Sequence, residues 1–492
     1  MISKSFIKSS FIYSVVGSLP LATSIVLLPF YGNENLLSTH AFGLLAVYIV
    51  FTELVRLLYN YSVGAFMGTN IIRFSDSRDK QQKLIGTSIL FMLIYGGGMA
   101  IFTSLVGEWI FGLIFPDSDM LFYPYGLLAV FTGLFRGIFK TYSNFMIFKE
   151  RPRPFFWGNI LTFSLTVAAS VTGLYMFPQS LDGPMYGRFI SSVAGFVWAI
   201  VYFIGASRLR FDRKILKDLV SYSTPVFIYS LLFWAISSID RYIILDVLTA
   251  SKVGIFDFAI KMTMLVEFLQ TGLASAINPK VYKLWKKGGN VPESNTEINR
   301  YFNVFTLINQ ISIPVFYIAL LVGVPILISN EELYASFALL PILFAGMTAK
   351  VWYFYLSAPI YYFKKTVLLP VIFGIVAAFQ IGLTYIFLIH FDLEGAAWAN
   401  FATKIFQVFV LLLFVSRFFK VKVNPVKMIV YPLVYMLMLL SIHFWGGDYN
   451  PIFENALLFA MLVFLTVLVF RKEIPSMKSL LFKKNQPEKP TD

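Results

Sequence analysis

Charged side chains recur inside long apolar segments of this 492-residue chain. The stretch "SSIDRYIILD" places Asp240 beside Arg241 within an otherwise apolar run from Pro225 to Leu248. A charge at the centre of a lipid bilayer costs at least about 2.5–3.5 kcal/mol unless it is paired or hydrated. Charges in such segments therefore indicate ion pairs between helices, a hydrated cavity, or a site that binds a charged ligand.

Twelve charged residues fall inside the predicted membrane spans, eight bases against four acids. The bases are Arg56, Arg136, Lys140, Arg188, Arg241, Lys261, Lys350 and Lys404, and the acids are Glu53, Asp240, Asp257 and Glu267. Because so many charges could not face lipid, we expect them to face the bundle interior or a hydrated cavity. The surplus of four positive charges implies an anionic ligand, or acids on distant helices that pair with the bases.

Helical spacing pairs some of these charges locally. Glu53 and Arg56 are three residues apart, and Asp257 and Lys261 are four apart, so each pair shares one helix face. We expect the first pair to be structural or to act in gating. Glu267 lies near the inner end of its span, where bracing and ion coupling both remain open.

Asp240 and Arg241 are sequence neighbours, so their side chains point about 100° apart on a helix. We therefore expect each to need its own partner. The predicted network joins Asp240 to Lys261 and Arg241 to Asp257. This arrangement would brace two helices and add charge to the outer part of a cavity.

Five bases have no acid close by on their own helix: Arg136, Lys140, Arg188, Lys350 and Lys404. Arg136 and Lys140 share one face of a span. Lys140 and Arg188 lie near span ends, where long side chains can also extend to the membrane surface. The three deeper bases are expected to line a cavity.

Composition shows which elements must position these charges. The chain is 58% hydrophobic and 13% charged, with a mean hydropathy of +0.73. A soluble protein this apolar could not cover its own surface. The apolar runs are continuous rather than alternating, which favours helices over a membrane β-barrel. We predict an all-α membrane protein with about fourteen transmembrane helices, near 10–30, 41–62, 84–105, 121–143, 155–176, 184–205, 221–246, 252–275, 302–328, 334–360, 366–389, 394–416, 426–445 and 451–470.

The net charge of +14 is mainly an orientation signal. Basic residues gather in alternate connections, such as Lys4 with Lys8 and the connection 208–217, whereas the intervening connections carry acids such as Glu108 and Asp182. Because basic loops remain in the cytoplasm, both termini are predicted to be cytoplasmic. This distribution argues against nucleic-acid binding. The chain has no cysteine, which excludes disulfides, thiolate metal sites and cysteine nucleophiles.

An internal repeat is indicated by two pairs of matching segments. "AFGLLAVYIVF" and "KVGIFDFAIKM" align Gly43 with Gly254, and "DGPMYGRFIS" and "EGAAWANFAT" align Gly183 with Gly395, at nearly equal offsets. A six-helix unit used twice would give two lobes related by a pseudo-twofold axis along the membrane normal. The predicted parts are a first lobe (1–206), a second lobe (207–422), two further helices (423–472) and a cytoplasmic tail (473–492).

Other chemistry is poorly supported by the sequence. His40, His390 and His443 lie at outer ends of different spans, so no metal site is expected. No nucleotide-binding fingerprint is present, and no outward connection is long enough for a folded catalytic site. A membrane polymerase or glycosyltransferase is therefore disfavoured, and we expect no enzyme. Aromatic-rich stretches suit interface belts or packing, with contact to sugar rings as the alternative.

Three segments resemble one family of membrane proteins. Residues 221–262 resemble the helix 7–8 signature of polysaccharide flippases, and 64–85 and 394–406 resemble two further parts of them. The positions that match the signature are Pro225, Asp240, Arg241, Val253 and Gly254. The chain thus resembles Wzx-like members of the multidrug/oligosaccharidyl-lipid/polysaccharide (MOP) exporter superfamily along essentially its whole length.

The resemblance implies a flippase of the bacterial cytoplasmic membrane. Such a protein moves polyprenyl-diphosphate-linked oligosaccharide to the outer leaflet by alternating access, for surface polysaccharide synthesis. The diphosphate would be attracted by Arg136, Lys350 and Lys404, with Arg241 and Lys261 nearer the outside. The implied partners are the lipid-linked oligosaccharide, membrane lipids and other polysaccharide-assembly membrane proteins.

Two alternatives within the superfamily stay open. A peptidoglycan-precursor flippase would also have a basic cavity and fourteen helices. A proton- or sodium-coupled multidrug antiporter would instead be expected to favour acidic residues in its cavity. No cofactor is expected, and coupling to Na⁺ or H⁺ through Asp257, Glu53 or Glu267 remains a hypothesis.

Overall fold

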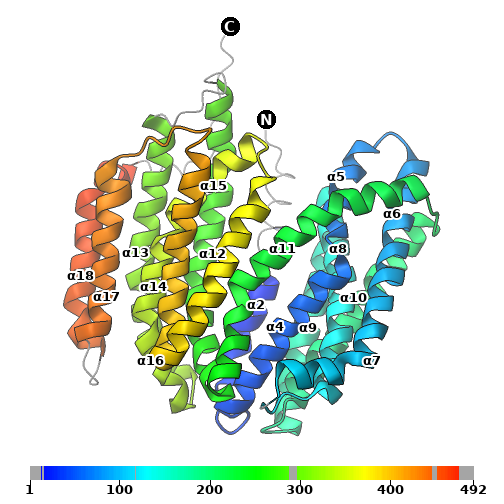
Figure 1. Ribbon diagram of the computed structural model, residues 1–492, viewed down its shortest axis with the longest axis horizontal. Helices are drawn as coiled ribbons and strands as arrows, with labels where there is room; N and C mark the ends of the chain where they lie inside the picture. Colours follow the sequence, from blue (N-terminus) through cyan, green and yellow to red (C-terminus); the bar gives the residue numbers. More distant parts are fainter. Residues whose placement is uncertain (1–12, 14–15, 117, 288–295, 446–450, 476–492) are drawn as a thin grey trace. The chain divides into compact units, whose positions relative to one another are not determined.

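The computed structural model describes residues 13, 16–116, 118–287, 296–445 and 451–475, and the elements in this part of the chain are helices (Figure 1). The predicted all-α class is thus confirmed. The tail 473–492 lies almost wholly outside the described residues. The first elements in chain order are α2 (Leu19–Val26), α3 (Leu28–Tyr31), α4 (Thr39–Asn60), α5 (Val63–Arg73), α6 (Arg78–Phe91), a π-helical segment (Met92–Gly96), α7 (Gly97–Ile114), a second π-helical segment (Phe122–Gly126), α8 (Leu127–Phe148), α9 (Pro152–Met176), α10 (Asp182–Ser207) and α11 (Arg213–Val247).

The chain continues through α12 (Ala250–Lys287), α13 (Thr296–Leu327), a 3₁₀ segment (Glu331–Leu339), α14 (Leu340–Thr348), α15 (Lys350–Tyr362), α16 (Leu368–Val415), a π-helical segment (Val426–Val430), α17 (Tyr431–Trp445) and α18 (Pro451–Val469). Within the described residues, ten helical stretches are long and apolar enough to cross a membrane. The count of fourteen spans stays a prediction.

The difference between ten and fourteen has several sources. The first predicted span falls partly outside the described residues, and so do the side chains of 451–457 at the start of the last one. Helix α12 carries Lys252, Asp257, Lys261 and Glu267, which lower its hydropathy. Two predicted spans fall within the single element α16 and count as one stretch. They are separated at Phe391 and Asp392, where the backbone leaves the helical conformation.

The described residues form two compact units. The N-terminal unit comprises the described part of Ile2–Asp257 together with Ile328–Leu333, and the C-terminal unit comprises that of Phe258–Leu327 and Tyr334–Asp492. Helix α11 belongs to the N-terminal unit because it packs on α4, α5 and α6. The compact unit therefore extends past residue 206, where the sequence placed the end of the first lobe. Whether the lobes 1–206 and 207–422 move as bodies stays a prediction.

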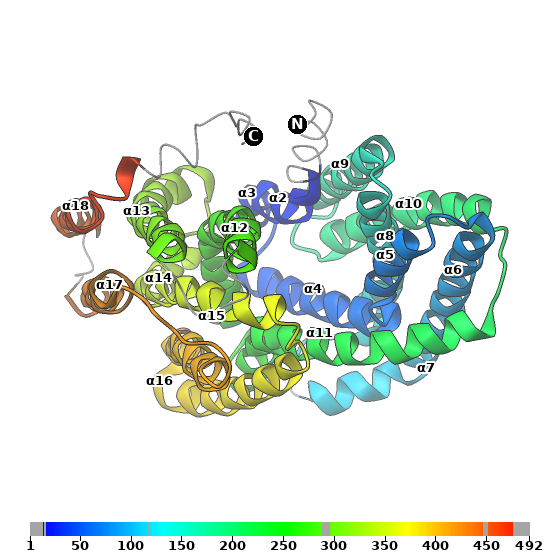
Figure 2. The ribbon, with the colours of Figure 1, turned by 90° about the horizontal axis from the view of Figure 1, so that it is seen from above.

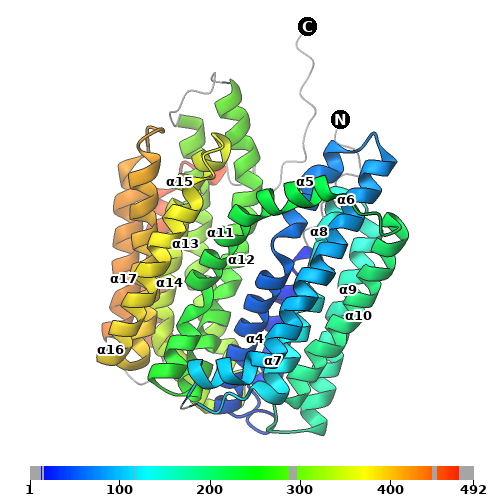
Figure 3. The same cartoon turned by 45° about the vertical axis from the view of Figure 1, so that its right-hand side comes forward.

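In the N-terminal unit, α8, α9 and α10 run side by side, and α4 packs along α8 (Figure 3). Close packing is aided by small residues: a Cβ on Gly133 of α8 would lie 2.8 Å from the carbonyl oxygen of Thr52 on α4. Interhelical approach through small residues is a common means of membrane helix association. This contact brings the charged face of α4 against α8.

In the C-terminal unit, α13 packs on α18, and α14 packs on both α16 and α17 (Figure 2). Lys427 and Glu473 join the ends of this group, since the Lys427 ammonium lies 2.6 and 2.7 Å from the two Glu473 carboxylate oxygens. Asn303 of α13 also donates a hydrogen bond to this carboxylate, at 3.3 Å. The pair ties α13 to the segments that flank α17 and α18.

Glycines of the predicted repeat lie at close helix approaches. A Cβ on Gly43 of α4 would lie 1.7 Å from the carbonyl oxygen of Ala250. A Cβ on Gly254 of α12 would lie 2.6 Å from the carbonyl oxygen of Thr39. The two glycines that the repeat aligns therefore face each other where the first turns of α4 and α12 meet.

The second aligned pair of glycines, Gly183 and Gly395, also lies at close approaches of the backbone. A Cβ on Gly183 of α10 would lie 2.4 Å from the backbone nitrogen of Leu174, at the end of the preceding helix. A Cβ on Gly395 would lie 2.1 Å from the carbonyl oxygen of Phe387, again at the end of the preceding helical stretch. Aligned glycines thus serve the same close turn in both halves, which supports the six-helix repeat.

Gly43→Ala should destabilise the protein by roughly 1–3 kcal/mol or more, because the added methyl group meets a backbone carbonyl that cannot rotate away. The measurement is the unfolding midpoint of purified protein in detergent. Gly97→Ala is the matched control, since a Cβ there meets nothing within 4 Å. Equal midpoints for the two variants would contradict the close approach.

Candidate functional site

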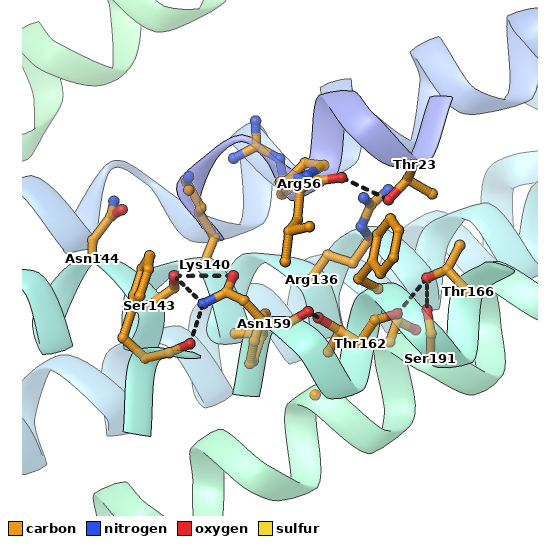
Figure 4. Close-up of a pocket in the computed structure, with 18 of the residues that line it drawn as sticks. Thr23, Arg56, Arg136, Lys140, Ser143, Asn144, Asn159, Thr162, Thr166 and Ser191 are labelled. Atoms are coloured by element: carbon orange, nitrogen blue, oxygen red, sulfur yellow. Dashed lines mark hydrogen bonds between the residues drawn. The ribbon is translucent and has the colours of Figure 1, made fainter. Parts of the chain in front are cut away.

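A cavity of about 250 Å³ lies among α2, α4, α8, α9 and α10 of the N-terminal unit (Figure 4). Its charged lining residues are Glu53 and Arg56 from α4 and Arg136 and Lys140 from α8. The polar remainder of its wall includes Thr23, Ser143, Asn144, Asn159, Thr162, Thr166, Ser191 and Ser192. We call this the basic cavity.

Glu53 is the centre of the charge cluster. The Arg56 Nε lies 2.7 Å from Glu53 Oε2, which confirms the predicted pair one turn apart. The Arg136 Nη1 lies 3.6 Å from Glu53 Oε1, so the distant acid that Arg136 required comes from α4. Arg188 of α10 is close enough for its charge to act on both Glu53 and Arg136.

Two further bases complete the cluster. Lys140 lies one turn beyond Arg136, and its side chain is exposed toward the basic cavity. Arg188 is only 9% exposed, so it does not extend to the membrane surface as the sequence allowed. Its Nε has no hydrogen-bond partner among the described residues. Around the basic cavity, the described residues thus set four bases against a single carboxylate.

Small polar residues form the opposite wall. The Asn159 amide donates to Ser143 Oγ at 3.0 Å and to the Phe155 carbonyl at 2.8 Å. The Thr166 hydroxyl lies 2.7 Å from Ser191 Oγ. Sequence reasoning missed this wall. The three- and four-residue spacing of Asn159, Thr162 and Thr166 on one face of α9 was the available signal.

A second cluster lies in the C-terminal unit. The Lys350 ammonium on α15 is 2.8 Å from Glu267 Oε1 on α12. Lys404 of α16 is close enough for its charge to act on Glu267. The structure therefore supplies a distant acid for Lys350 and brings together three of the predicted site residues.

The two clusters are built alike. In the predicted numbering of spans, Glu53 and Glu267 occupy the second helix of their repeats. Arg136 and Lys350 occupy the fourth. Each half thus sets one carboxylate against bases from its fourth and sixth helices, since Arg188 and Lys404 lie on the latter. This recurrence supports the repeat on chemical grounds.

Asp240 and Arg241 lie in a buried network. The Arg241 Nε and Nη2 each lie 3.2 Å from Asp257 Oδ1, as predicted. The expectation that Asp240 needs a partner other than its neighbour is wrong in part, because Arg241 Nη1 also lies 2.7 Å from Asp240 Oδ1. The same nitrogen also donates to the Ser237 carbonyl at 3.0 Å. These contacts favour bracing over ligand binding for Arg241. Lys261 lies one turn beyond Asp257 on α12 and is also buried.

The histidines do not converge. His40 lies 3.0 Å from Asp119, and His443 lies 3.3 Å from Glu394. The described residues contain no group of three or more histidine, aspartate or glutamate side chains that could hold a metal ion. Of the predicted charges, the structure gathers most into three places: the two acid-centred clusters and the Arg241 network.

Residues 6–285, more than half of the chain, match the family described as polysaccharide biosynthesis protein. The chain belongs to this family. No curated protein matches the sequence. Membership confirms the resemblance to polysaccharide exporters that residues 221–262 indicated.

Solved structures of transporters show which fold the chain has. The lipid II flippase MurJ in an inward closed conformation matches 96% of the chain and 100% of its own length, with a TM-score of 0.65 and 14% identity. An inward-facing MATE family multidrug resistance transporter of the MOP superfamily matches 84% of the chain and 98% of its own, with a TM-score of 0.67 and 14% identity. A MATE structure in the bent conformation matches 84% and 94%, with a TM-score of 0.57 and 16% identity. The protein therefore has the fold of MOP-superfamily transporters.

Proposed function

We propose that this protein flips a polyprenyl-diphosphate-linked oligosaccharide from the cytoplasmic to the outer leaflet, during surface polysaccharide synthesis. The observation that carries this proposal is the basic cavity, where bases outnumber acids in a member of a polysaccharide biosynthesis family. A diphosphate is the part of such a substrate that needs a hydrated, positively charged passage through the membrane.

The chemistry of the basic cavity suits a phosphate group. Arginine presents a planar fork of donors that binds phosphate oxygens in pairs, and lysine adds a point charge. Glu53 contacts the guanidinium groups of Arg56 and Arg136 and so holds them in position. A diphosphate would compete with this one carboxylate for the surrounding bases. Glu267, Lys350 and Lys404 offer an equivalent cluster in the second repeat.

The family alternatives differ in the charge they need. A peptidoglycan-precursor flippase would use the same bases, and the fold shared with MurJ favours it as the second candidate. The basic cavity would repel the organic cations that a multidrug antiporter carries. Alternating access, coupling to Na⁺ or H⁺, placement in the bacterial inner membrane with both termini cytoplasmic, and association with other assembly proteins belong to the same proposal.

The test is transport in liposomes. Purified protein would be reconstituted, and a labelled polyprenyl-diphosphate oligosaccharide, a peptidoglycan precursor and an organic cation would each be followed across the bilayer, with and without Na⁺ and pH gradients. Neutralising Arg136 and Lys140 together by Arg136→Gln and Lys140→Gln should slow movement of the lipid-linked oligosaccharide at least tenfold, because each charge-assisted hydrogen bond contributes roughly 1.5–3 kcal/mol. The matched control is Lys214→Gln with Lys217→Gln, on the exposed first turns of α11. Undiminished transport by the first double variant would overturn the proposal, and transport of the organic cation alone would favour the antiporter.

A further inference from the structure

A second cavity, of about 430 Å³, lies between α4 and α11 of the N-terminal unit. It shares Glu53 and Arg56 with the basic cavity, so these two residues stand in the wall of both. Its remaining lining is different in kind. Three aromatic residues, Tyr229, Phe233 and Trp234, line it together with serines of α11. We call it the aromatic cavity.

The aromatic and hydroxyl groups form two neighbouring stripes on α11. Residues four apart on a helix share a face. Tyr229, Phe233 and Ser237 make one stripe, and Ser230, Trp234 and Ser238 make the next. The "YSLLFWAISS" segment thus presents rings and hydroxyls on one continuous surface toward α4.

One ring of this surface is fixed by a hydrogen bond, and the other two lie near each other. The Trp234 Nε1 donates to the carbonyl oxygen of Val50 on α4, at 3.3 Å, which fixes the plane of the indole. The rings of Tyr229 and Phe233 lie 6.4 Å apart at an angle of 40°. Phe233 is 47% exposed, so part of its side chain is accessible in the cavity. A ring that is already fixed, such as that of Trp234, loses little entropy when a ligand covers it.

The hydroxyl groups are oriented to accept hydrogen bonds. Ser230 Oγ donates to the Val226 carbonyl at 2.8 Å, and Ser237 Oγ donates to the Phe233 carbonyl at 2.8 Å. Because each hydroxyl proton is used by the helix itself, the oxygen lone pairs are left for a ligand that donates. The Glu53 carboxylate also stands at the edge of the cavity, where its oxygens are shared with Arg56 and Arg136 and retain lone pairs for a further donor.

Aromatic faces beside a row of acceptors match a sugar unit. A pyranose ring has an apolar face of C–H groups, which packs on aromatic rings, and hydroxyl groups that donate from its rim. A polyprenyl tail would pack on the rings but would donate no hydrogen bond to the serine and carboxylate oxygens, and covering those oxygens with hydrocarbon carries a desolvation cost. Sites of this kind combine mainly apolar walls with a few placed polar groups.

We propose that the aromatic cavity binds a sugar unit of the lipid-linked oligosaccharide while the bases around Glu53 receive its diphosphate. This inference rests on the proposed function, since it places two parts of one substrate on either side of the wall formed by Glu53 and Arg56. The sugar bonded to the diphosphate is the unit whose distance from the phosphates suits adjacent cavities. Specificity for the glycan then resides in α11.

The experiment compares binding of two ligands to purified protein in detergent: a polyprenyl diphosphate that carries an oligosaccharide and the same polyprenyl diphosphate without sugars. Phe233→Ala should raise the Kd of the first ligand on the order of tenfold and leave the Kd of the second unchanged. Because Phe233 is half exposed, this truncation opens no internal void. Ser237→Leu, which fills the cavity instead of emptying it, should have the same selective effect. Ile228→Ala, at an exposed apolar position of α11, is the matched control.

The outcomes separate the two proposals. Wild-type protein that binds the sugar-bearing ligand tightly, with both variants unchanged, would overturn the aromatic cavity as a sugar site and leave the flippase function standing. Equal weakening of both ligands by Phe233→Ala would also overturn it, since the ring would then contact the tail or support the fold. Wild-type protein that binds neither ligand would contradict the proposed function itself.

Discussion

Replacing Glu53 by glutamine is expected to destabilise the protein by about 2–3 kcal/mol. The carboxylate is shared by Arg56 and Arg136, and the charge of Arg188 also acts on it. Removing one partner of a fully buried ion pair costs roughly 3–5 kcal/mol, because the remaining charge is left uncompensated. The Glu53 side chain is 35% exposed to the cavities, so hydration reduces this cost. The measurement is the free energy of unfolding of purified protein in detergent.

A double-mutant cycle identifies the cause. Arg136→Gln removes one of the cations that Glu53 neutralises. If the cluster acts as a unit, the variant with both Glu53→Gln and Arg136→Gln should be more stable than the sum of the single losses predicts, by about 1 kcal/mol or more. Glu108→Gln makes the same chemical change at an exposed position and should leave stability within about 0.5 kcal/mol of wild type. Strict additivity would show that Glu53 and Arg136 do not interact.

This cluster also illustrates what a single sequence can predict about a site. The contact of Glu53 with Arg56 followed from helical spacing alone, because residues three apart always share a face. The contact of Glu53 with Arg136 joins α4 to α8, and which helices pack together is not encoded in any local spacing. The sequence could therefore require a distant acid for Arg136 but could not name it.

The fold likewise has features that the sequence predicts and features that it does not. Hydropathy placed α4 within two residues of its observed ends, and it separated the two stretches that meet at Phe391 and Asp392. These features depend on composition over about 20 residues. The association of α11 with the N-terminal helices depends on tertiary packing, such as the hydrogen bond between Tyr61 and Thr224, which no window of sequence contains. The packing of α11 on these helices was therefore not predictable from the sequence alone.

The polar wall of the basic cavity was missed for a different reason. Serine and threonine are common in membrane helices, where they bond to a carbonyl one turn back and need no further partner. Thr166 does this, donating to the Thr162 carbonyl at 2.7 Å. Its additional contact with Ser191 could not be distinguished from that background. A charge inside a membrane span is recognisable in the sequence because its burial is costly. A hydroxyl group inside a span carries no such signal.

Asp240 and Arg241 show where helix geometry misleads. The 100° between neighbouring positions describes the Cα–Cβ directions, but an arginine side chain is long enough to fold back along its helix. The guanidinium group reaches Asp240 on one side and Asp257 on the other, and so serves both carboxylates. Arg241 is 4% exposed, and Asp240 and Asp257 are 1% and 5% exposed.

Arg241→Met should therefore be among the most destabilising single changes, at about 3–5 kcal/mol, because two buried carboxylates lose the cation that they share. Methionine retains much of the side-chain volume, so the effect would be electrostatic rather than a void. Arg241→Lys should recover only part of the loss, since one ammonium group cannot reproduce the fork that contacts Asp240, Asp257 and the Ser237 carbonyl. Unfolding midpoints of the two variants in detergent provide the measurement.

The result also separates bracing from substrate binding. A bracing residue lowers stability in proportion to the contacts removed, and transport by the folded fraction is retained. A ligand-binding residue leaves the unfolding midpoint unchanged while transport is lost. Because the Arg241 fork is engaged with Asp240, Asp257 and a backbone carbonyl, we expect the first pattern for Arg241→Met. The second pattern would mean that the diphosphate displaces one of these carboxylates from Arg241. The bases that contact the diphosphate would then extend from the basic cavity to the C-terminal end of α11.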